Sequence, residues 1–387
     1  MDNNLIYLDN AATSWPKPEE VYRTMENFMR HIGANPGRSG HRLSIEAGRV
    51  VYEAREIIAQ LFNLDDPLRV IFTKNATEAL NLTVRGILRP GDHVITSTME
   101  HNSVMRPLRA LEDQGVEITT VNCSAEGFLD PQDVGKTIKS KTRLIILNHA
   151  SNVVGTLVPV AEIGAIARRH NVIFCVDAAQ TAGAFPIDIK VMNIDLLAFS
   201  GHKLLFGPPG TGGLCVAKGV EDVLKPLMRG GTGSRSESEH QPSFLPDKYE
   251  SGTPNTVGLA GLAAGVKFIL SQGIANLRPR EENLTRRIIE EIQTIPKVTL
   301  YGSGDPRQQV AVVSFNIAGL SSSEVALQLD EDYNIMCRPG LQCAPLAHKT
   351  LGTFPLGTVR ISPGYFTTED NIKTFLEAIA KIASKAK

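Results

Sequence analysis

The sequence lacks several features that would assign it to a specialised class of protein. Hydrophobic residues make up 42% of its 387 positions, yet no apolar run approaches the roughly 20 residues that span a bilayer. The formal net charge of -1 gives no electrostatic preference for nucleic acid or for an anionic membrane. The N-terminus, MDNNLIYLDN, lacks the basic-then-apolar layout of a signal peptide. We therefore expect a soluble, cytoplasmic protein without nucleic-acid or membrane partners.

Cysteine is also scarce. Five cysteines stand at positions 123, 175, 215, 337 and 343, and no two have C-x-x-C spacing. In a reducing compartment an odd count argues against a disulfide framework, and no Cys/His cluster has the spacing of metal ligands. Cys175 and Cys215 lie within apolar runs and are expected in the core. Cys337 follows NIM and is typical of a strand end, whereas Cys343 follows CRPGLQ and is predicted to lie in a loop.

Short strand-like runs alternate with helical patterns from about residue 69 to 217. Runs such as NVIFCVDAA and DLLAFS are continuously apolar, as expected of strands covered by helices on both faces. This alternation predicts an α/β fold whose large domain, residues 20–256, contains a mostly parallel central sheet. Helical patterns and later strands predict a smaller α+β domain over residues 257–387, joined by residues 1–19. Ligands usually bind where the parallel strands end.

One lysine stands at the end of such an apolar run. In FSGHKLLFGPPGTGG, Lys203 follows Ser200 and His202 and precedes a loop rich in glycine and proline. Most lysines at strand ends extend to water, but a desolvated amine here would be a usable nucleophile. Such an amine condenses with an aldehyde, which is how pyridoxal phosphate (PLP) is held. Two competing motifs fail, because S-x-x-K lacks its companions K-T-G and S-D-N, and no G-x-x-x-x-G-K-[ST] is present.

Other strand ends carry residues that suit this cofactor. Asp177 in CVDAAQT would hold the pyridinium proton, although Asp177 and Gln180 also resemble a helix capping box. Asn75, Ala76 and Thr77 lie at a strand-to-helix turn whose free N–H groups suit a phosphate, with ordinary capping as the alternative.

Two further residues could contact the cofactor, and each has an alternative interpretation. His101 in STMEHNS offers a flat ring that would stack on the cofactor, and a solvated loop histidine is the alternative. Asn152 in NHASNVVGT follows another strand, where an Asx-turn is the alternative.

Together these motifs resemble the class V aminotransferase group of PLP enzymes, which have the type I aminotransferase fold. Within that group the chain is most similar to cysteine desulfurases of the second type and to selenocysteine lyases. The resemblance covers essentially the whole chain, through YLDNAATSWPKP, NPGRSGHRLS, NATEALN, EHNS, NHASNVVGT, VDAAQ, SGHK, SGTPN, RPGLQCA and TVRIS. SGHK together with VDAAQ at this separation is highly specific for the group.

The resemblance implies a role for each matching residue. Lys203 would bind the aldehyde of PLP and move protons at the substrate Cα, and Asp177 would pair with the pyridinium. His101 would stack on the ring, while Asn152 and Gln180 would hydrogen-bond near the ring oxygen. The other implied cofactor-binding residues are Ala76, Thr77, Ser200, His202 and, reaching across from the partner subunit of a homodimer, Thr253.

Cys343 would distinguish a desulfurase from other members of the group. The resemblance implies that its thiolate attacks the sulfur of bound L-cysteine and forms a persulfide and L-alanine. Arg338 and Arg360, with Asn152, would bind the substrate and its α-carboxylate. Judged singly, an incidental loop cysteine and solvated surface arginines are the alternatives. The family often has GHHCA here, whereas this chain reads GLQCAPLAH, with His348 five residues after Cys343.

The predicted function is a homodimeric, PLP-dependent cysteine desulfurase that passes sulfur to an acceptor protein. A lyase acting on L-selenocysteine, a transaminase, an epimerase or another β-eliminating enzyme would use the same cofactor, and these stay alternatives. A non-catalytic scaffold that has kept the fold is a third possibility.

Overall fold

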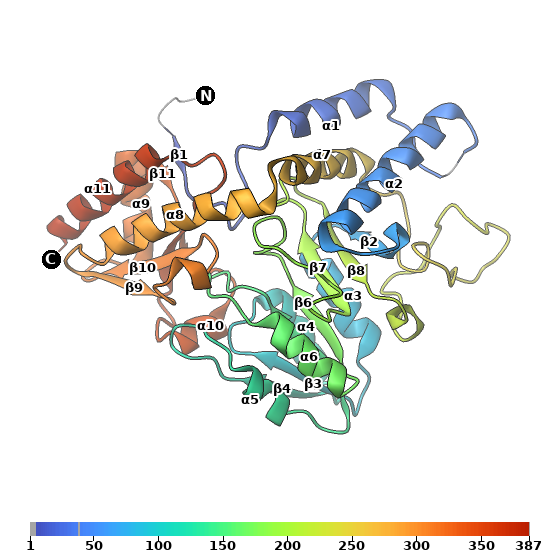
Figure 1. The fold of residues 1–387 in the computed structure, drawn as a ribbon, viewed down its shortest axis with the longest axis horizontal. Helices are drawn as coiled ribbons and strands as arrows, with labels where there is room; N and C mark the ends of the chain where they lie inside the picture. The colour runs from blue at the N-terminus through green and yellow to red at the C-terminus, as the bar shows by residue number, and fades with distance from the viewer. Residues whose placement is uncertain (1–4, 38, 387) are drawn as a thin grey trace.

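The computed structural model describes residues 5–37 and 39–386 (Figure 1). Arg38, within the NPGRSGHRLS stretch, lies outside the described residues. The central sheet has seven strands in the order β2-β8-β7-β6-β5-β3-β4. Their bounds are β2 (Val70–Thr73), β3 (His93–Ser97), β4 (Glu117–Val121), β5 (Thr142–Asn148), β6 (Ile173–Asp177), β7 (Leu196–Ser200) and β8 (Gly212–Val216).

The central sheet is mostly parallel, as predicted. Strands β4, β3, β5, β6 and β7 all run in one direction. Only β8 is reversed, because it pairs antiparallel with both of its neighbours, β7 and β2. Strands β5, β6 and β7 therefore end at the same edge, which is the edge where ligands of such sheets bind.

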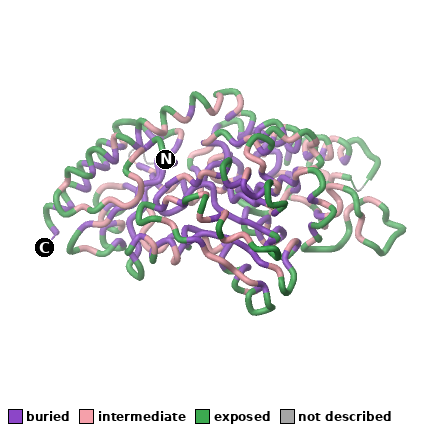
Figure 2. Tube along the Cα trace, turned by 60° about the horizontal axis from the view of Figure 1, so that its bottom comes forward, coloured by how far each residue is buried: buried purple, intermediate pink, exposed green. Residues whose placement is uncertain are grey.

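Helices cover both faces of this sheet (Figure 1). On β6, Phe174 and Val176 pack into one hydrophobic core, while Cys175 between them packs into the core on the opposite face. Both faces are buried, which explains why these strands are continuously apolar (Figure 2). The helices of this part are α1 (Glu19–His31), α2 (Arg42–Phe62), α3 (Ala76–Ile87), α4 (Asn102–Glu112), α5 (Pro131–Lys136), α6 (Val160–Arg169) and α7 (Thr256–Gln272).

A smaller unit with its own core follows. Its four-stranded antiparallel sheet has the order β12-β13-β10-β9, and a parallel pair joins β1 to β11. Ile6 and Leu8 pack into this second core, so the first residues of the described chain lie with the small unit. The elements of the smaller unit are β1 (Ile6–Tyr7), α8 (Ile274–Ile292), β9 (Val298–Tyr301), β10 (Val313–Ile317), α9 (Ser322–Tyr333), β11 (Ile335–Met336), β12 (Arg338–Gly340), α10 (Pro345–Thr350), β13 (Thr358–Ile361) and α11 (Glu369–Lys385), with a short 3-10 helix at Pro306–Gln308. Two further 3-10 helices, Pro67–Arg69 and Val220–Asp222, belong to the larger unit.

Helix α7 connects the two units and packs mainly on the first. Its residues Leu262, Val266 and Ile269 are buried in the core that covers one face of the seven-stranded sheet. The chain then bends by 85° between α7 and α8. The predicted division at 256/257 stays a prediction, and this packing favours a boundary at Gly273. Among the described residues no single helix is long and apolar enough to cross a membrane, although the bent α7–α8 pair passes that test together.

If α7 belongs to the first core, shortening its buried side chains should destabilise the protein. We expect Ile269→Ala, at a fully buried position, to lower the free energy of unfolding by about 2–5 kcal/mol. The matched control is Lys267→Ala on the same helix, whose exposed ion pair with Glu53 is worth about 0–1 kcal/mol. Urea unfolding followed by circular dichroism measures both. Equal losses in the two variants would contradict this packing.

Candidate active site

A cavity of about 250 Å³ opens at the carboxyl ends of β5, β6 and β7. Parallel strands end at one edge, so residues more than 100 positions apart in the sequence meet here. With the exception of Thr253, every residue predicted to bind the cofactor lines this cavity. Its lining is Asn75, Ala76, Thr77, His101, Ser103, Asn148, Ala150, Asn152, Asp177, Ala179, Gln180, Ser200, His202 and Lys203.

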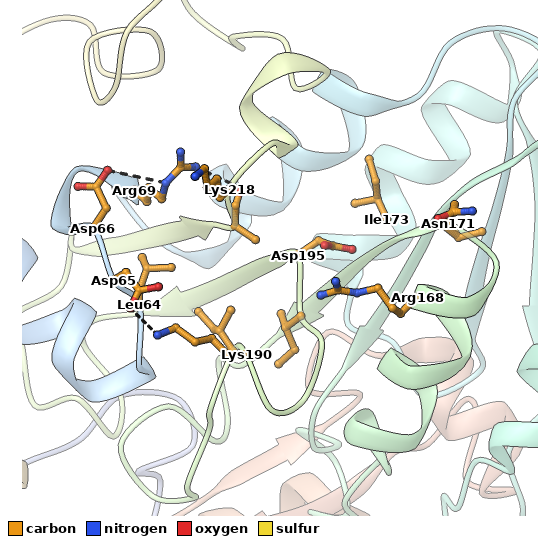
Figure 3. A pocket seen from close by; sticks show the side chains of 14 residues that line it. Leu64, Asp65, Asp66, Arg69, Arg168, Asn171, Ile173, Lys190, Asp195 and Lys218 are labelled. Atoms are coloured by element: carbon orange, nitrogen blue, oxygen red, sulfur yellow. Dashed lines mark hydrogen bonds and ion pairs between the residues drawn. The ribbon is translucent and has the colours of Figure 1, made fainter.

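A larger cavity, of about 760 Å³, lies at the opposite end of the sheet (Figure 3). It surrounds the start of β6 and the residues just before β7, and it contains none of the predicted site residues. Among its charged side chains, Lys190 pairs with Asp65 and Arg69 pairs with Asp66. Size alone therefore does not locate the chemistry of this protein.

Lys203 lies in a tight turn directly after β7, as predicted. Gly201 permits this turn, because a Cβ atom there would lie 2.3 Å from Oγ1 of Thr211. A turn rather than a helix follows Ser200, so the structural context required by S-x-x-K is absent here. Burial lowers the pKa of Lys203 to about 8, against the opposing effect of the Asp177 carboxylate. A substantial fraction of the amine is therefore neutral and nucleophilic near that pH.

The N-terminal segment holds this turn in place. The Lys17 ammonium donates a hydrogen bond to the carbonyl oxygen of His202 (2.8 Å), and the Ser14 hydroxyl donates to that of Lys203 (2.7 Å). Burial lowers the pKa of Lys17 to about 8. The sequence alone indicated no role for these two residues, although both lie in the YLDNAATSWPKP motif. Their function is visible only once the segment is seen against the turn.

Asp177 is buried at the end of β6. Its Oδ1 accepts a hydrogen bond from the backbone N–H of Ala179 (2.9 Å) in a turn, so the alternative reading as a helix capping box is wrong. Gln180 instead donates to the carbonyl oxygen of Ala11 (3.2 Å). Burial raises the pKa of Asp177, and the nearby positive charge of Lys203 lowers it. A second cation beside this carboxylate, such as a pyridinium, would stabilise its charged form.

The N-terminus of α3 forms an anion cradle at the same cavity. Asn75 is the N-cap and accepts from the N–H of Glu78 (2.9 Å). The N–H groups of the first turn, at Ala76 and Thr77, have no acceptor within the helix and can therefore donate to a ligand. Gly212 allows α3 to approach the sheet, since a Cβ there would lie 2.6 Å from Cα of Asn75. Nδ1 of His202 is buried and has no hydrogen-bond partner among the described residues. These features fit a phosphate group.

His101 is the N-cap of α4 and is held along one edge of its ring. Its Nδ1 accepts from the N–H of Ser103 (3.0 Å), so the proton of the neutral ring is on Nε2. The Ser103 hydroxyl, 2.7 Å from Nδ1, is in turn 2.8 Å from Oγ1 of Thr77. Burial lowers the pKa of His101 to about 4, which keeps the ring neutral. The alternative interpretation of His101 as a solvated loop histidine is wrong. Ser103 also lines the cavity, and no sequence motif indicated it.

Arg360 is fully buried, so its reading as a solvated surface residue is wrong. Its guanidinium pairs with Oδ1 of Asp9 (2.7 Å) and donates to the carbonyl oxygen of Asn152 (3.0 Å), while its Nε has no partner among the described residues. Burial lowers the pKa of Arg360. Arg338 lies directly opposite Arg360 across the β12–β13 pair. Like charges placed opposite each other repel, so this arrangement favours an anion beside them.

Cys343 is exposed in the loop between β12 and α10, as predicted. A terminal nitrogen of Arg338 lies 3.3 Å from its Sγ, within hydrogen-bonding distance of a sulfur atom. The loop is tied to the cavity by Asn152, whose Nδ2 donates to the carbonyl oxygen of Gln342 (2.8 Å). Cys337 differs, because it is half-buried directly after β11 and burial raises its pKa to about 12.

Thr253 lies apart from this cavity within its own chain. It lines a separate cavity of about 470 Å³ and its hydroxyl accepts from Nδ2 of Asn35 (3.3 Å). Its predicted role requires a second subunit, which stays a prediction.

The residues at the main cavity fit PLP. Lys203 supplies an amine, Asp177 a buried carboxylate and α3 an anion cradle. Oδ1 of Asn152 and Nδ1 of His202 are both buried polar atoms without a partner among the described residues. Buried polar groups are rarely left unpaired, so each marks a position where a ligand atom would complete a hydrogen bond. The described residues contain no group of three or more His, Cys, Asp or Glu side chains that could hold a metal ion.

Comparison with known proteins agrees with this geometry. A family profile described as aminotransferase class-V matches residues 6–375. The chain belongs to the class V aminotransferase family. A probable cysteine desulfurase of Methanothermobacter thermautotrophicus is 35% identical, over 98% of this chain and 94% of that protein. A cysteine desulfurase of Escherichia coli O157:H7 is 33% identical, over 88% of this chain and 84% of its own.

Solved structures of the same family have this fold. A cysteine desulfurase from Thermococcus onnurineus, in its apo form, superimposes with a TM-score of 0.93 at 35% identity, covering 99% of this chain and 95% of the other. A cysteine desulfurase from Escherichia coli superimposes with a TM-score of 0.88 at 27% identity, covering 100% of this chain and 96% of the other. The predicted family and the predicted fold are therefore confirmed.

The lowered pKa of Lys203 predicts how the cofactor-free protein takes up PLP. The neutral amine attacks an aldehyde, so uptake should accelerate as the pH rises through about 8 and level off above it. The appearance of the Schiff-base absorbance band after PLP is added to cofactor-free protein measures the rate. Lys203→Arg should give no band, whereas Lys218→Arg, at an exposed position, should behave as the wild type. A band in Lys203→Arg would assign the amine to another residue.

Proposed function

We propose that this protein is a PLP-dependent cysteine desulfurase that acts on L-cysteine. The observation that carries the proposal is the position of Cys343, an exposed thiol 3.3 Å from Arg338 on a loop tied to the cavity by Asn152. A cysteine in this position is not needed by a transaminase or an epimerase. The names of the relatives and of the solved structures support the same activity.

Lys203, Asp177, His101 and the N-terminus of α3 would hold PLP, with Asn152 and Gln180 completing the contacts to its ring. When bound, PLP supplies an electron sink that makes the bonds at the substrate Cα and Cβ reactive. Lys203 then has the position and the lowered pKa of a group that takes up and returns a proton at the substrate Cα.

The opposed arginines would orient the substrate and Cys343 would accept its sulfur. Arg360 grips the α-carboxylate through the planar fork of its guanidinium, helped by Arg338. The Cys343 thiolate attacks the substrate sulfur, so that an S–S bond forms while the Cβ–S bond breaks. The electron pair of the broken bond stays on Cβ and takes up a proton. The sum is L-cysteine plus the Cys343 thiol giving L-alanine plus a Cys343 persulfide.

A homodimer would complete the site, with Thr253 of the partner subunit reaching the phosphate. Thr253 lies outside the cavity of its own chain, and the exposed apolar side chains of Leu227, Met228 and Phe244 lie in the same stretch of sequence. Apolar surface of this kind is suited to contact with a second copy. We further propose a cytoplasmic location and an acceptor protein that removes the persulfide sulfur.

Replacement of the nucleophile tests the proposed activity. Cys343→Ser should abolish L-alanine and sulfide formation from L-cysteine, assayed with a dithiol to release the sulfur, while the absorbance band of bound PLP persists. Cys337→Ser should retain activity, because that thiol is half-buried and its pKa is raised. Wild-type rates of alanine formation in Cys343→Ser would point to a different lyase, and parallel assays with L-selenocysteine would identify a selenium-specific enzyme.

The proposed binding of the substrate α-carboxylate by Arg360 can be tested by substitution. Arg360→Lys keeps the charge but loses the planar fork, so KM for L-cysteine should rise at least about tenfold, equivalent to about 1.4 kcal/mol. Steady-state assays of alanine formation measure the effect. Arg287→Lys, whose side chain pairs with Glu291 and Glu369 in the small unit, is the matched control and should leave KM unchanged. An unaltered KM in Arg360→Lys would remove this residue from substrate binding.

A further inference from the structure

We infer that Gln342 and His348 are positioning residues that hold the Cys343 loop in its working geometry. This inference rests on the proposed desulfurase function and concerns a stretch where the chain departs from the family's GHHCA. His348 is five residues from Cys343 in the sequence, but its ring lies under the loop and contacts Gln342, the residue immediately before the thiol.

The Gln342 side chain points inward and is fully hydrogen-bonded. It is only 2% exposed although its neighbour Cys343 is exposed. Its Nε2 donates to the carbonyl oxygen of Thr358 (2.9 Å) on β13 and to that of Arg338 (3.3 Å) on β12. Its Oε1 faces Nε2 of His348 at 2.8 Å. One amide therefore joins the loop to both strands that carry the opposed arginines.

These contacts fix the orientation and the protonation of His348. Because the amide nitrogen of Gln342 donates to two carbonyl groups, its oxygen must accept, and Nε2 of His348 carries the proton. Nδ1 then accepts from the Thr353 hydroxyl, 2.7 Å away. Burial lowers the pKa of His348 to about 4, so the ring is neutral near neutral pH. Gln342, His348 and Thr353 therefore keep the same donor and acceptor roles. A fully satisfied buried network of this kind makes a segment rigid.

The loop needs such support because its backbone is strained. Gln342 and Cys343 have φ values of +41° and +60°, the left-handed region that residues other than glycine seldom adopt. Such conformations persist only where surrounding contacts hold them. Here the carbonyl oxygen of Gln342 accepts from Asn152, and that of Cys343 accepts from the N–H of Asn102 (2.8 Å) at the start of α4. The buried Gln342 side chain supplies the third anchor.

The position of the Cys343 loop affects catalysis as well as folding. A thiolate must approach the substrate sulfur in line with the bond that breaks, and a misplacement of about 1 Å can cost about 10²-fold in rate. Asn152 lines the cavity, Asn102 lies between the lining residues His101 and Ser103, and Arg338 is the residue beside Sγ. Loss of the Gln342 side chain would remove the ties to β12, β13 and His348, and the thiol could then shift relative to both the substrate and Arg338.

The test compares Gln342→Met, which keeps the side-chain volume but removes the hydrogen bonds, with Gln342→His, which retains one donor and one acceptor. In Gln342→Met we expect kcat for alanine formation to fall about 10- to 100-fold with KM for L-cysteine and the PLP absorbance unchanged. Alkylation of Cys343 by iodoacetamide, followed by peptide mass analysis, should also slow because the thiol loses Arg338. Gln342→His should recover part of both losses. Gln114→Ala, at an exposed turn, is the control.

The outcomes separate this inference from the proposed function. If the wild type makes no alanine, the proposed function fails, and the alkylation rates still report on the positioning of Cys343. Wild-type kcat and alkylation in Gln342→Met would overturn the inference. Loss of the PLP band, or a rise in KM that matches the fall in kcat, would also overturn it, because either result assigns Gln342 a general structural role.

Discussion

The buried guanidinium of Arg360 makes the contacts on which the rest of the site depends. It comes from β13 of the small unit, pairs with Asp9 of the N-terminal segment and donates to Asn152 of the large sheet's loops. A buried charge that loses one partner costs about 3–5 kcal/mol, so these three parts of the chain are strongly favoured to stay together. The same assembly brings the Cys343 loop to the mouth of the cavity.

Burial at this edge sets the protonation states of several groups at once. It lowers the pKa of Lys203 to about 8 and the pKa values of His101 and His202 to about 4, and it raises that of Asp177. Near neutral pH the two rings are therefore neutral, and the amine is close to the point at which it releases its proton. A low local dielectric thus prepares one nucleophile and keeps added positive charge away from it.

The two nucleophiles of the proposed reaction are positioned in different ways. Lys203 lies in a turn whose carbonyl groups are bound by Ser14 and Lys17 of the N-terminal segment. Cys343 is exposed, yet its loop is anchored by buried neighbours rather than by contacts of its own side chain alone. An exposed thiol on an anchored loop can meet substrate in the cavity and an acceptor outside it.

Much of the molecule is determined by the sequence alone. The continuous apolar runs of β5, β6 and β7 indicated a sheet buried on both faces, and local motifs indicated the family and the cluster of residues around Lys203. Such signals are local, because they depend on periodicity and on spacing within one segment. The fold and family predictions were confirmed for this reason.

Only the tertiary structure decided which distant residues meet. The burial of Arg360, the contact of Lys17 with the Lys203 turn and the link from His348 to Gln342 all join segments or faces that periodicity does not relate. Asp177 and Gln180 resembled a capping box in sequence, but the chain turns there instead of forming a helix, and Gln180 donates to the carbonyl oxygen of Ala11, 169 positions away. Long-range hydrogen bonds and burial override local patterns, and they are set by the packing of the whole chain.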